Sequence, residues 1–290
     1  MTSHFISRVS VLGTGLIGGS FALALRKYTA QIHISGWDRP DVVREAQTRG
    51  ALDEAFSDSL APALQGSDLI YIGLPIASTL DHLQEIARHA PSHALITDAC
   101  STKVRVSQSA GALFPGENGP RFLGGHPMAG RELSGIAHAD ADLFRGNTYA
   151  LIGSSSAQED PRVSAFVKIL EKIGARPLWL GAPQHDYAVG LASHLPQLAA
   201  VSLASFLYDR LDENGLPITL AGPGLRDSLR LAGSPYSTWR DIVLTNQEVL
   251  SAALDLFARR LDDLRERLAS RELEADFDAA NELYKLLRSL

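Results

Sequence analysis

Cysteine is almost absent from this chain, and its scarcity limits where the protein can work. Cys100 is the single cysteine among 290 residues, so no disulfide can form within the chain. This usage fits a reducing compartment, and we expect a cytoplasmic protein. We interpret Cys100 as a small buried residue beside an apolar strand rather than as a reactive thiol.

Long basic runs and long apolar runs are also missing. The net charge is −6, from 27 basic and 33 acidic side chains, and no long run of lysine and arginine occurs. This balance gives no support for nucleic-acid binding. Because no stretch of 18 or more consecutive apolar residues is present, we expect no membrane span. The remaining composition is that of an ordinary globular protein, and 290 residues suit two domains.

A glycine-rich turn near the start organises the rest of the chain. Gly13, Gly15 and Gly18 follow the apolar stretch 9–12 and open a helical stretch, which is the G-x-G-x-x-G arrangement of a dinucleotide-binding unit. The first glycine permits a sharp turn, the second lets the backbone approach a pyrophosphate, and the third lets helix and strand pack closely. Asp38 ends the next predicted strand, where a carboxylate can hold the ribose hydroxyls of NAD.

Strands and helices alternate from residue 1 to about residue 182. The apolar stretches 9–12, 32–36, 69–73, 94–97, 122–124, 149–152 and 177–180 are the expected strands. Helices are expected at 21–27, 42–49, 79–89, 103–113 and 161–173. The alternation predicts an α/β domain with a mostly parallel sheet over residues 1–182. Ligands bind such sheets at the carboxyl ends of the strands, so informative residues should follow strands.

Three loops that follow strands carry candidate site residues. Leu74 and Pro75 end a strand and either lie over a dinucleotide or merely terminate that strand. Ser101 either caps the following helix or orients a catalytic group or the nicotinamide. His126 lies between glycines and a proline in what we expect to be a rigid loop, and we favour a catalytic role for it.

Residues 183–290 have the pattern of an all-α domain. The stretch that begins at His185 predicts a long helix, apolar almost all round and therefore buried, with a kink at Pro196. His194 lies beside this kink, and buried histidines need partners or a ligand. Arg230 lies among apolar residues, where it either pairs with a nearby acid such as Asp227 or binds a substrate carboxylate in bidentate fashion.

Apolar residues near the end of the chain form a stripe at alternating spacings of four and three. The stripe consists of Leu250, Leu254, Phe257, Leu261, Leu264 and Leu268, and Phe277, Ala280, Tyr284 and Leu287 continue it. Helices of this kind make a poor isolated core. We therefore predict a homodimer with a helical interface.

In its motifs the chain resembles the prephenate/arogenate (cyclohexadienyl) dehydrogenases of tyrosine biosynthesis. The resemblance covers nearly the whole length and depends on several motifs that occur in the family's order. These are the glycine turn, Asp98-x-x-Ser101-x-Lys103, Gly-Gly-His126-Pro-Met-Ala-Gly, His185-Asp186, Ser193-His194-Leu-Pro196, Arg226-Asp227-x-x-Arg230 and Trp239-Arg-Asp-Ile. The resemblance implies a Rossmann-like N-terminal domain and an all-α C-terminal dimerisation domain. It also implies NAD(P)-dependent oxidative decarboxylation of a small cyclohexadiene acid.

The resemblance assigns roles to individual residues. His126 would accept a hydrogen bond from the 4-hydroxyl of the substrate, and Ser101 would hold this histidine and the hydroxyl. The substrate residues would be Arg230, His194, Gln197, Trp239 and Glu132. The cofactor residues would be Gly13, Gly15, Leu16, Ile17, Gly18, Asp38, Arg39, Leu74, Pro75 and Ser101, with no metal. Asp38 favours NAD over NADP because a carboxylate repels a 2′-phosphate, an argument that Arg39 weakens.

The preferred substrate is left open at one position. Gln197 stands where some prephenate-specific relatives have a second histidine. A glutamine is neutral and can accept a hydrogen bond from an ammonium group. We expect prephenate as the substrate, with arogenate, or both, as the alternative.

Two other functions stay open from the sequence. A different dehydrogenase of similar architecture commonly uses a lysine of its helical domain, but residues 183–270 contain no lysine. A non-catalytic dinucleotide sensor would keep the glycine turn and Asp38 but would not need His126.

Overall fold

The computed structural model describes residues 6–29, 31–114, 116, 119–130, 133–153, 155–211 and 215–289. Its first part is an eight-stranded sheet in the order β3-β2-β1-β4-β5-β6-β7-β8. The strands are β1 (Arg8–Leu12), β2 (His33–Trp37), β3 (Glu54–Phe56), β4 (Leu69–Ile72), β5 (Leu95–Asp98), β6 (Arg121–Pro127), β7 (Thr148–Ile152) and β8 (Arg176–Leu180). Neighbours pair in parallel except β6 and β7, which pair antiparallel. The predicted mostly parallel sheet is confirmed.

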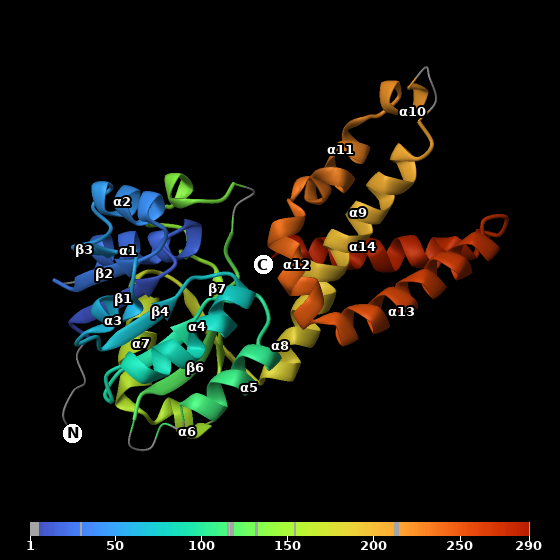
Figure 1. Ribbon diagram of the computed structural model, residues 1–290. Coiled ribbons are helices and arrows are strands. Elements are labelled where there is room, and N and C mark those ends of the chain that lie inside the picture. The colour runs from blue at the N-terminus through green and yellow to red at the C-terminus, as the bar shows by residue number, and fades with distance from the viewer. Residues whose placement is uncertain are drawn as a thin grey trace.

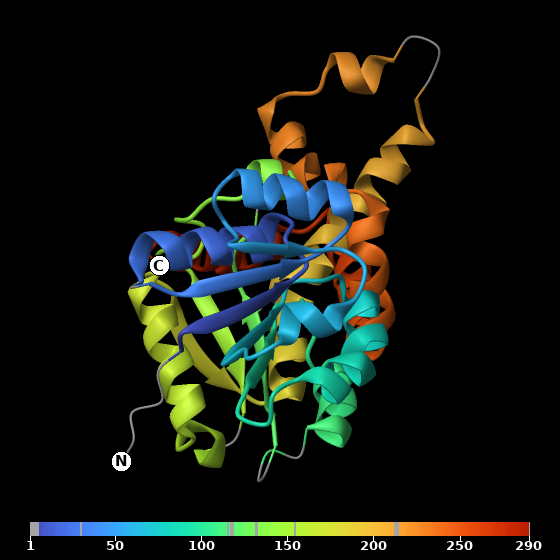
Figure 2. The same ribbon diagram turned by 60° about the vertical axis from the view of Figure 1, so that its left-hand side comes forward.

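Helices cover both faces of this sheet (Figures 1 and 2). They are α1 (Leu16–Tyr28), α2 (Pro40–Thr48), α3 (Leu60–Leu64), α4 (Ile76–His89), α5 (Val104–Leu113), η1 (Ile136–His138), α6 (Ser155–Gln158) and α7 (Pro161–Lys172). Phe21 of α1 and Phe166 of α7 belong to the core on one face. Leu83 of α4 and Phe114 after α5 belong to the core on the other. The central strands are buried on both sides, which explains their nearly continuous apolar sequence.

Two strands differ from the expectation. β3 was not predicted, because Glu54–Phe56 is three residues long and partly exposed and follows α2 after a short connection. β6 is longer than the predicted strand 122–124 and extends to Pro127. His126 therefore lies in a strand, paired with Ala150 of β7, and not in a loop. The expectation of a loop was wrong because glycine and proline at the end of a strand have the same local signature as a turn.

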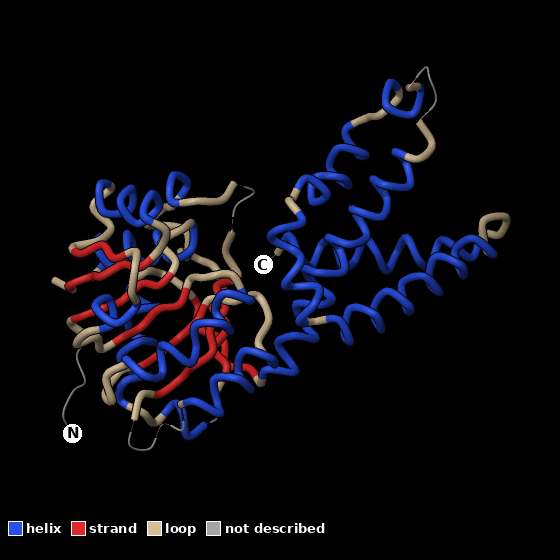
Figure 3. The backbone as a smooth tube through the Cα atoms, in the orientation of Figure 1, coloured by secondary structure: helices blue, strands red, loops and turns tan. Residues whose placement is uncertain are grey.

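The second part of the chain is entirely helical in the residues described (Figure 3). Its helices are α8 (Ala182–Val189), η2 (Gly190–His194), α9 (Leu195–Tyr208), α10 (Leu216–Thr219), α11 (Pro223–Leu229), η3 (Arg230–Gly233), α12 (Tyr236–Thr245), α13 (Gln247–Glu266), η4 (Arg271–Leu273) and α14 (Glu274–Arg288). The predicted division after residue 182 lies one residue into α8. An α/β first part and an all-α second part confirm the predicted fold class.

The predicted long helix is present, but it is not buried all round. α8, η2 and α9 run without a break from Ala182 to Tyr208, and η2 is a π-helical turn just before Pro196. One side of the helix carries buried polar groups, whereas Leu191, Phe206 and Tyr208 are exposed. Within a single chain the helix therefore has an uncovered apolar side, which the sequence alone did not reveal.

By length and composition this helix is also apolar enough to cross a membrane. One such helix is weak evidence, because the core helix of a soluble protein passes the same test. Here the helix holds His185, Asp186 and His194 buried against the rest of the protein. Burial of these groups among protein partners favours a helix that packs on protein over one that faces lipid.

The two parts are joined by buried carboxylates of the helical part. Asp186 accepts hydrogen bonds from the backbone N–H groups of Lys103 and Val104 at 2.7 and 2.9 Å, at the start of α5. Asp241 accepts one from the N–H of Ala77 at 3.1 Å, at the start of α4. A carboxylate at a helix N-terminus satisfies unpaired donors and interacts favourably with the helix dipole. These contacts fix the helical part over the carboxyl edge of the sheet.

Candidate active site

The glycine turn has the geometry that each glycine predicted. Gly13 has a φ of 85°, and a Cβ there would lie 2.7 Å from the backbone carbon of Gly73. A Cβ on Gly18 would lie 1.9 Å from the backbone oxygen of Gly13. A Cβ on Gly15, in contrast, would meet no atom within 4 Å. Gly13 and Gly18 are therefore needed to close the turn, whereas Gly15 leaves open space at the start of α1.

Asp38 is held as a fixed acceptor beside this turn. Its carboxylate accepts hydrogen bonds from the backbone N–H groups of Thr14 and Arg39, each at 2.7 Å. The two bonds engage different oxygens. The Thr14 hydroxyl donates at 3.3 Å to the oxygen that the Thr14 N–H also engages, so the oxygen bound by Arg39 retains a lone pair for a further donor. The end of β2 thus presents a preorganised negative charge next to the N-terminus of α1.

The predicted cofactor residues come together along one edge of the sheet. Leu16 and Ile17 begin α1, and Leu74 and Pro75 lie between β4 and α4. Gly15, the N-cap of α1, makes no side-chain cap, so the first N–H groups of this helix face the open space above the turn. This combination fits the pyrophosphate and ribose of a dinucleotide.

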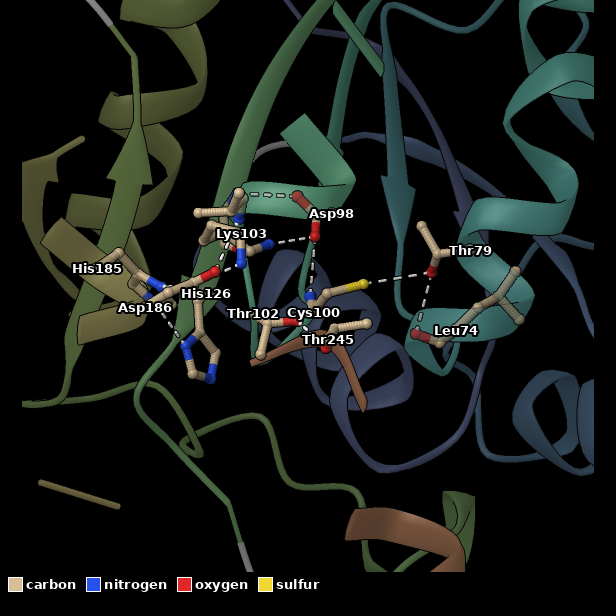
Figure 4. Close-up of polar contacts among 12 residues, drawn as sticks. Leu74, Thr79, Asp98, Cys100, Thr102, Lys103, His126, His185, Asp186 and Thr245 are labelled. Carbon is tan, nitrogen blue, oxygen red and sulfur yellow. Dashed lines mark hydrogen bonds and ion pairs between the residues drawn. The ribbon is translucent and has the colours of Figure 1, made fainter. Parts of the chain in front are cut away.

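His126 lies at the end of β6 on the same edge (Figure 4). Its Nδ1 is 2.9 Å from Nε2 of His185, and Nδ1 of His185 is 2.8 Å from a carboxylate oxygen of Asp186. His185 and Asp186 come from α8, so the helical part supplies the groups that hold the His126 ring. His126 itself is half-buried, which leaves it reachable at the edge of the sheet.

A buried ion pair supports the backbone beside His126. Lys103 and Asp98 are wholly buried and form a salt bridge with each other. The Lys103 ammonium also donates to the carbonyl of Gly125 at 2.6 Å, and the N–H of Gly125 donates to Asp98 at 3.1 Å. The pair therefore clamps both backbone groups of the residue before His126 to the end of β5.

The surroundings keep the His126 ring neutral. Loss of hydration, followed by the positive charge of Lys103, lowers the pKa of His126 well below its ordinary value. A neutral imidazole has one nitrogen with a free lone pair. His126 can thus accept a hydrogen bond at neutral pH.

Ser101 lies in the segment between β5 and α5 and is partly exposed. The interpretation that it caps α5 is wrong. The N-cap of α5 is Lys103, whose side chain makes no cap, and the carboxylate of Asp186 takes the free N–H groups instead. Its other interpretation, contact with substrate or nicotinamide, stays a prediction.

The predicted substrate residues lie on the helical part. The rings of His194 and Trp239 meet edge to face with centroids 5.8 Å apart. Gln197 is buried and donates through Nε2 to the carbonyl of Leu231 at 2.9 Å, which ties α9 to the turn that begins with Arg230. Arg230 is exposed, and Glu132 lies outside the described residues.

Comparison with known proteins shows to which family the chain belongs. A model of the prephenate dehydrogenase nucleotide-binding domain matches residues 21–178, and a model of the prephenate dehydrogenase dimerization domain matches residues 181–288. This chain belongs to the prephenate dehydrogenase family. The prephenate dehydrogenase of Lactococcus lactis subsp. cremoris is 33% identical over 271 residues, which are 93% of this chain and 73% of that protein.

Solved structures of this family superpose along almost the whole chain. Prephenate dehydrogenase from Aquifex aeolicus, in complex with hydroxyphenyl propionate and NAD+, has a TM-score of 0.88 and 27% identity over 99% of each chain. Synechocystis arogenate dehydrogenase has a TM-score of 0.76 and 29% identity over 97% of this chain and 96% of that one. The resemblance found in the sequence is confirmed.

Four polar residues around His126 and His194 received no individual role from the sequence. His185, Asp186 and Lys103 stand in family motifs, and Asn246 carries no motif at all. A signal was present for the first two, since an acidic residue after a histidine in an apolar helix needs a partner. Among the described residues no group of three or more His, Cys, Asp or Glu side chains is placed to hold a metal ion.

Proposed function

We propose that this chain catalyses the NAD-dependent oxidative decarboxylation of prephenate to 4-hydroxyphenylpyruvate. The observation that carries the proposal is His126, a neutral imidazole on the same sheet edge as an open glycine turn and a fixed carboxylate. Family membership and the names of the relatives support the same reaction. A sensor without catalysis would not need a histidine in this position.

NAD fits the first part of the site better than NADP. The glycine turn and the N-terminus of α1 suit the pyrophosphate, and Asp38 suits the ribose hydroxyls. A 2′-phosphate at Asp38 would meet a like charge, although Arg39 lies next in the chain. The neighbour from Aquifex aeolicus was solved with NAD+, which supports this assignment.

His126 takes up the proton of the 4-hydroxyl and gives it back to the same oxygen at the end of the reaction. NAD+ bound at the glycine turn and Asp38 would supply the acceptor for the hydride that leaves the ring carbon bearing the 4-hydroxyl. His126 accepts the hydroxyl proton as that C–H bond breaks. The bond to the ring carboxylate then breaks, CO2 leaves, and its electron pair makes the ring aromatic. The proton returns from His126 to the phenolic oxygen, so prephenate and NAD+ give 4-hydroxyphenylpyruvate, CO2 and NADH.

The helical part supplies the substrate contacts in this proposal. Arg230 binds a substrate carboxylate, and His194 and Trp239 line the pocket. From the first part of the chain, Ser101 holds the hydroxyl beside His126, and Glu132 is a further proposed substrate residue. With the ring placed against the nicotinamide, aromatisation provides much of the driving force, and positioning is the main task of the protein.

Arogenate is the second candidate substrate, and Gln197 is the observation that favours it. Its Nε2 donates to Leu231, so its Oε1 remains an acceptor inside a buried setting. An acceptor there suits the ammonium group that distinguishes arogenate from prephenate. The similarity to Synechocystis arogenate dehydrogenase agrees with this alternative.

The deciding experiment follows NADH or NADPH formation by the purified chain, with each cofactor, on prephenate and arogenate in parallel. We expect turnover with NAD+ on prephenate, and the ratio of the two substrates measures what Gln197 permits. His126→Asn should keep NAD binding and lose about 10²- to 10⁴-fold in kcat. NAD binding without turnover on either substrate would refute the proposed reaction.

We also propose a cytoplasmic homodimer. The match to a dimerization domain supports self-association, and the single cysteine suits a reducing compartment.

A further inference from the structure

Asp186 is linked to the two site histidines, His126 and His194, by hydrogen bonds that pass through one intervening side chain on each side. Its carboxylate reaches His126 through the ring of His185, over links of 2.8 and 2.9 Å. Its backbone carbonyl reaches His194 through Asn246, whose Nδ2 lies 2.9 Å from that carbonyl and 3.2 Å from Nδ1 of His194. Asp186, His185, Asn246 and His194 are all buried. Figure 4 shows the hydrogen bonds that link Asp186 to His126 through His185.

With His185 singly protonated, the donors and acceptors on the His126 side fit one order. An ionised carboxylate only accepts, so Nδ1 of His185 must carry a proton. A singly protonated His185 then has its lone pair on Nε2, and it accepts from Nδ1–H of His126. This order leaves the lone pair of His126 on Nε2, the nitrogen that has no partner within the chain of contacts.

The order on the His194 side is opposite. A backbone carbonyl only accepts, so the amide nitrogen of Asn246, and not its oxygen, faces Asp186. The second hydrogen of that nitrogen points to Nδ1 of His194. Burial, the largest cause, lowers the pKa of His194 to about 4, so this ring is neutral at pH 7. With its lone pair on Nδ1, the ring carries its single proton on Nε2.

We propose that Asp186 sets the two site histidines in opposite tautomers, His126 as an acceptor at Nε2 and His194 as a donor at Nε2. His185 and Asn246 transmit this choice, and all three are positioning residues. The inference deepens the proposed function, on which it rests. It gives the hydroxyl of the substrate an acceptor and gives a substrate carboxylate or carbonyl a donor. The same arrangement places the Asp186 carboxylate two hydrogen bonds from His126. There the carboxylate stabilises the protonated ring that forms when His126 accepts the hydroxyl proton.

Asp186 also holds the start of α5, so a loss of stability must be separated from a loss of orientation. Asp241 is a matched control because it too is a buried carboxylate of the helical part that holds a helix N-terminus, that of α4. No described contact links the Asp241 side chain to a site histidine. Asp186→Asn and Asp241→Asn should therefore both lower the melting temperature, and only the first should alter the histidines.

The direct test reads the tautomers by ¹⁵N NMR of the full chain labelled at histidine. Two-bond ¹⁵N–¹H spectra distinguish a protonated ring nitrogen from a bare one, and His126→Asn and His194→Asn assign the two rings. We expect His126 bare at Nε2 and His194 bare at Nδ1 in the wild type. Asp186→Asn should redistribute the His126 proton, and Asp241→Asn should not. A wild-type His126 with its proton on Nε2 would overturn the inference, since a doubly protonated His185 would produce that state.

A kinetic test examines the His194 side. Asn246→Asp replaces the donor by an acceptor of the same size, so His194 must turn its N–H toward it. We expect KM for the substrate to rise tenfold or more, with a smaller change in kcat. Asn147→Asp is the control, because Asn147 donates to the carbonyl of Leu143 and no described hydrogen bond links its side chain to either histidine. An unchanged KM in Asn246→Asp would refute this half of the inference.

The two proposals fail in different ways. Tautomers as expected, without turnover on prephenate or arogenate, would refute the proposed function and leave the histidine assignment standing. Turnover with the opposite tautomer of His126 would refute the assignment and leave the function standing.

Discussion

The neutral state of the site histidines is a property of single residues, and it links stability to pH. Burial lowers the pKa of His126 well below its ordinary value and that of His194 to about 4. In the unfolded chain both rings titrate near ~6.5, so between that pH and about 4 the unfolded state binds more protons. The free energy of unfolding should therefore fall as the pH is lowered through this window.

Urea unfolding at pH 7, 6 and 5 measures this effect. His194→Asn should show a shallower loss of stability over the same range, because it removes one of the two rings. Below about pH 4 the carboxylates take over, since Arg162 and the backbone lower the pKa of Asp160 to about 2 against the effect of burial. A wild type whose stability is flat from pH 7 to 5 would contradict the neutral assignment.

Lys103 is the second residue whose effect can be predicted. Lys103→Met leaves Asp98 as an uncompensated buried charge and should lower the free energy of unfolding by about 3–5 kcal/mol. It also removes a positive charge that lowers the pKa of His126, so that pKa should rise. Chemical unfolding checks the first effect, and an NMR titration of His126 checks the second.

Lys27→Met is the matched control for Lys103. Lys27 forms an ion pair with Asp142 whose side chains are 48% and 43% exposed, so little stability depends on it. Equal losses of unfolding free energy in Lys103→Met and Lys27→Met would show that the buried Lys103–Asp98 pair contributes no more stability than an exposed pair.

At the scale of elements, different glycines of the turn are needed for folding and for cofactor binding. Gly18→Ala would place a Cβ on a backbone oxygen and should cost about 3 kcal/mol or more. Gly15→Ala meets no atom within 4 Å and has a negative φ of −70°, so its melting temperature should fall much less than that of Gly18→Ala. The new methyl group would occupy the space proposed for the pyrophosphate, so the Kd for NAD should rise tenfold or more.

Calorimetry of both variants, with and without NAD, makes this comparison. A Gly15→Ala protein that binds NAD as tightly as the wild type would place the pyrophosphate elsewhere.

The elements also show what the sequence could and could not predict. Strand and helix alternation was readable because each central strand is buried on both sides and because α1, α2, α4 and α7 begin with a glycine or proline signal. His126 was identified as a site residue because it follows a predicted strand and stands between glycines and a proline, and the family resemblance gave it the same role. Its partners could not be derived, since His185 follows 59 residues later and only folding brings α8 against β6. A short polar strand such as β3 has no local signal that separates it from a loop.

At the scale of the whole molecule, most of the apolar stripe on α13 and α14 is left exposed by the described part of the chain, and Leu250 at its start is the buried exception. Leu254, Phe257 and Leu261 of α13 are 38%, 38% and 53% exposed. Phe277 and Leu287 on α14 are 73% and 62% exposed. Exposed apolar area of this extent marks an interaction surface, and the match to a dimerization domain indicates a second copy of the chain as the partner.

Charged substitutions on this stripe should therefore separate the dimer. Phe257→Glu and Leu261→Glu should sediment as monomers at micromolar concentration, where the wild type sediments as a dimer. Leu256→Glu is the control, because Leu256 is 64% exposed and projects about 120° around α13 from the centre of the stripe. The wild type should also melt at a temperature that rises with protein concentration, since association stabilises the folded state by mass action. A wild type that sediments as a monomer, or a melting temperature independent of concentration, would refute the dimer.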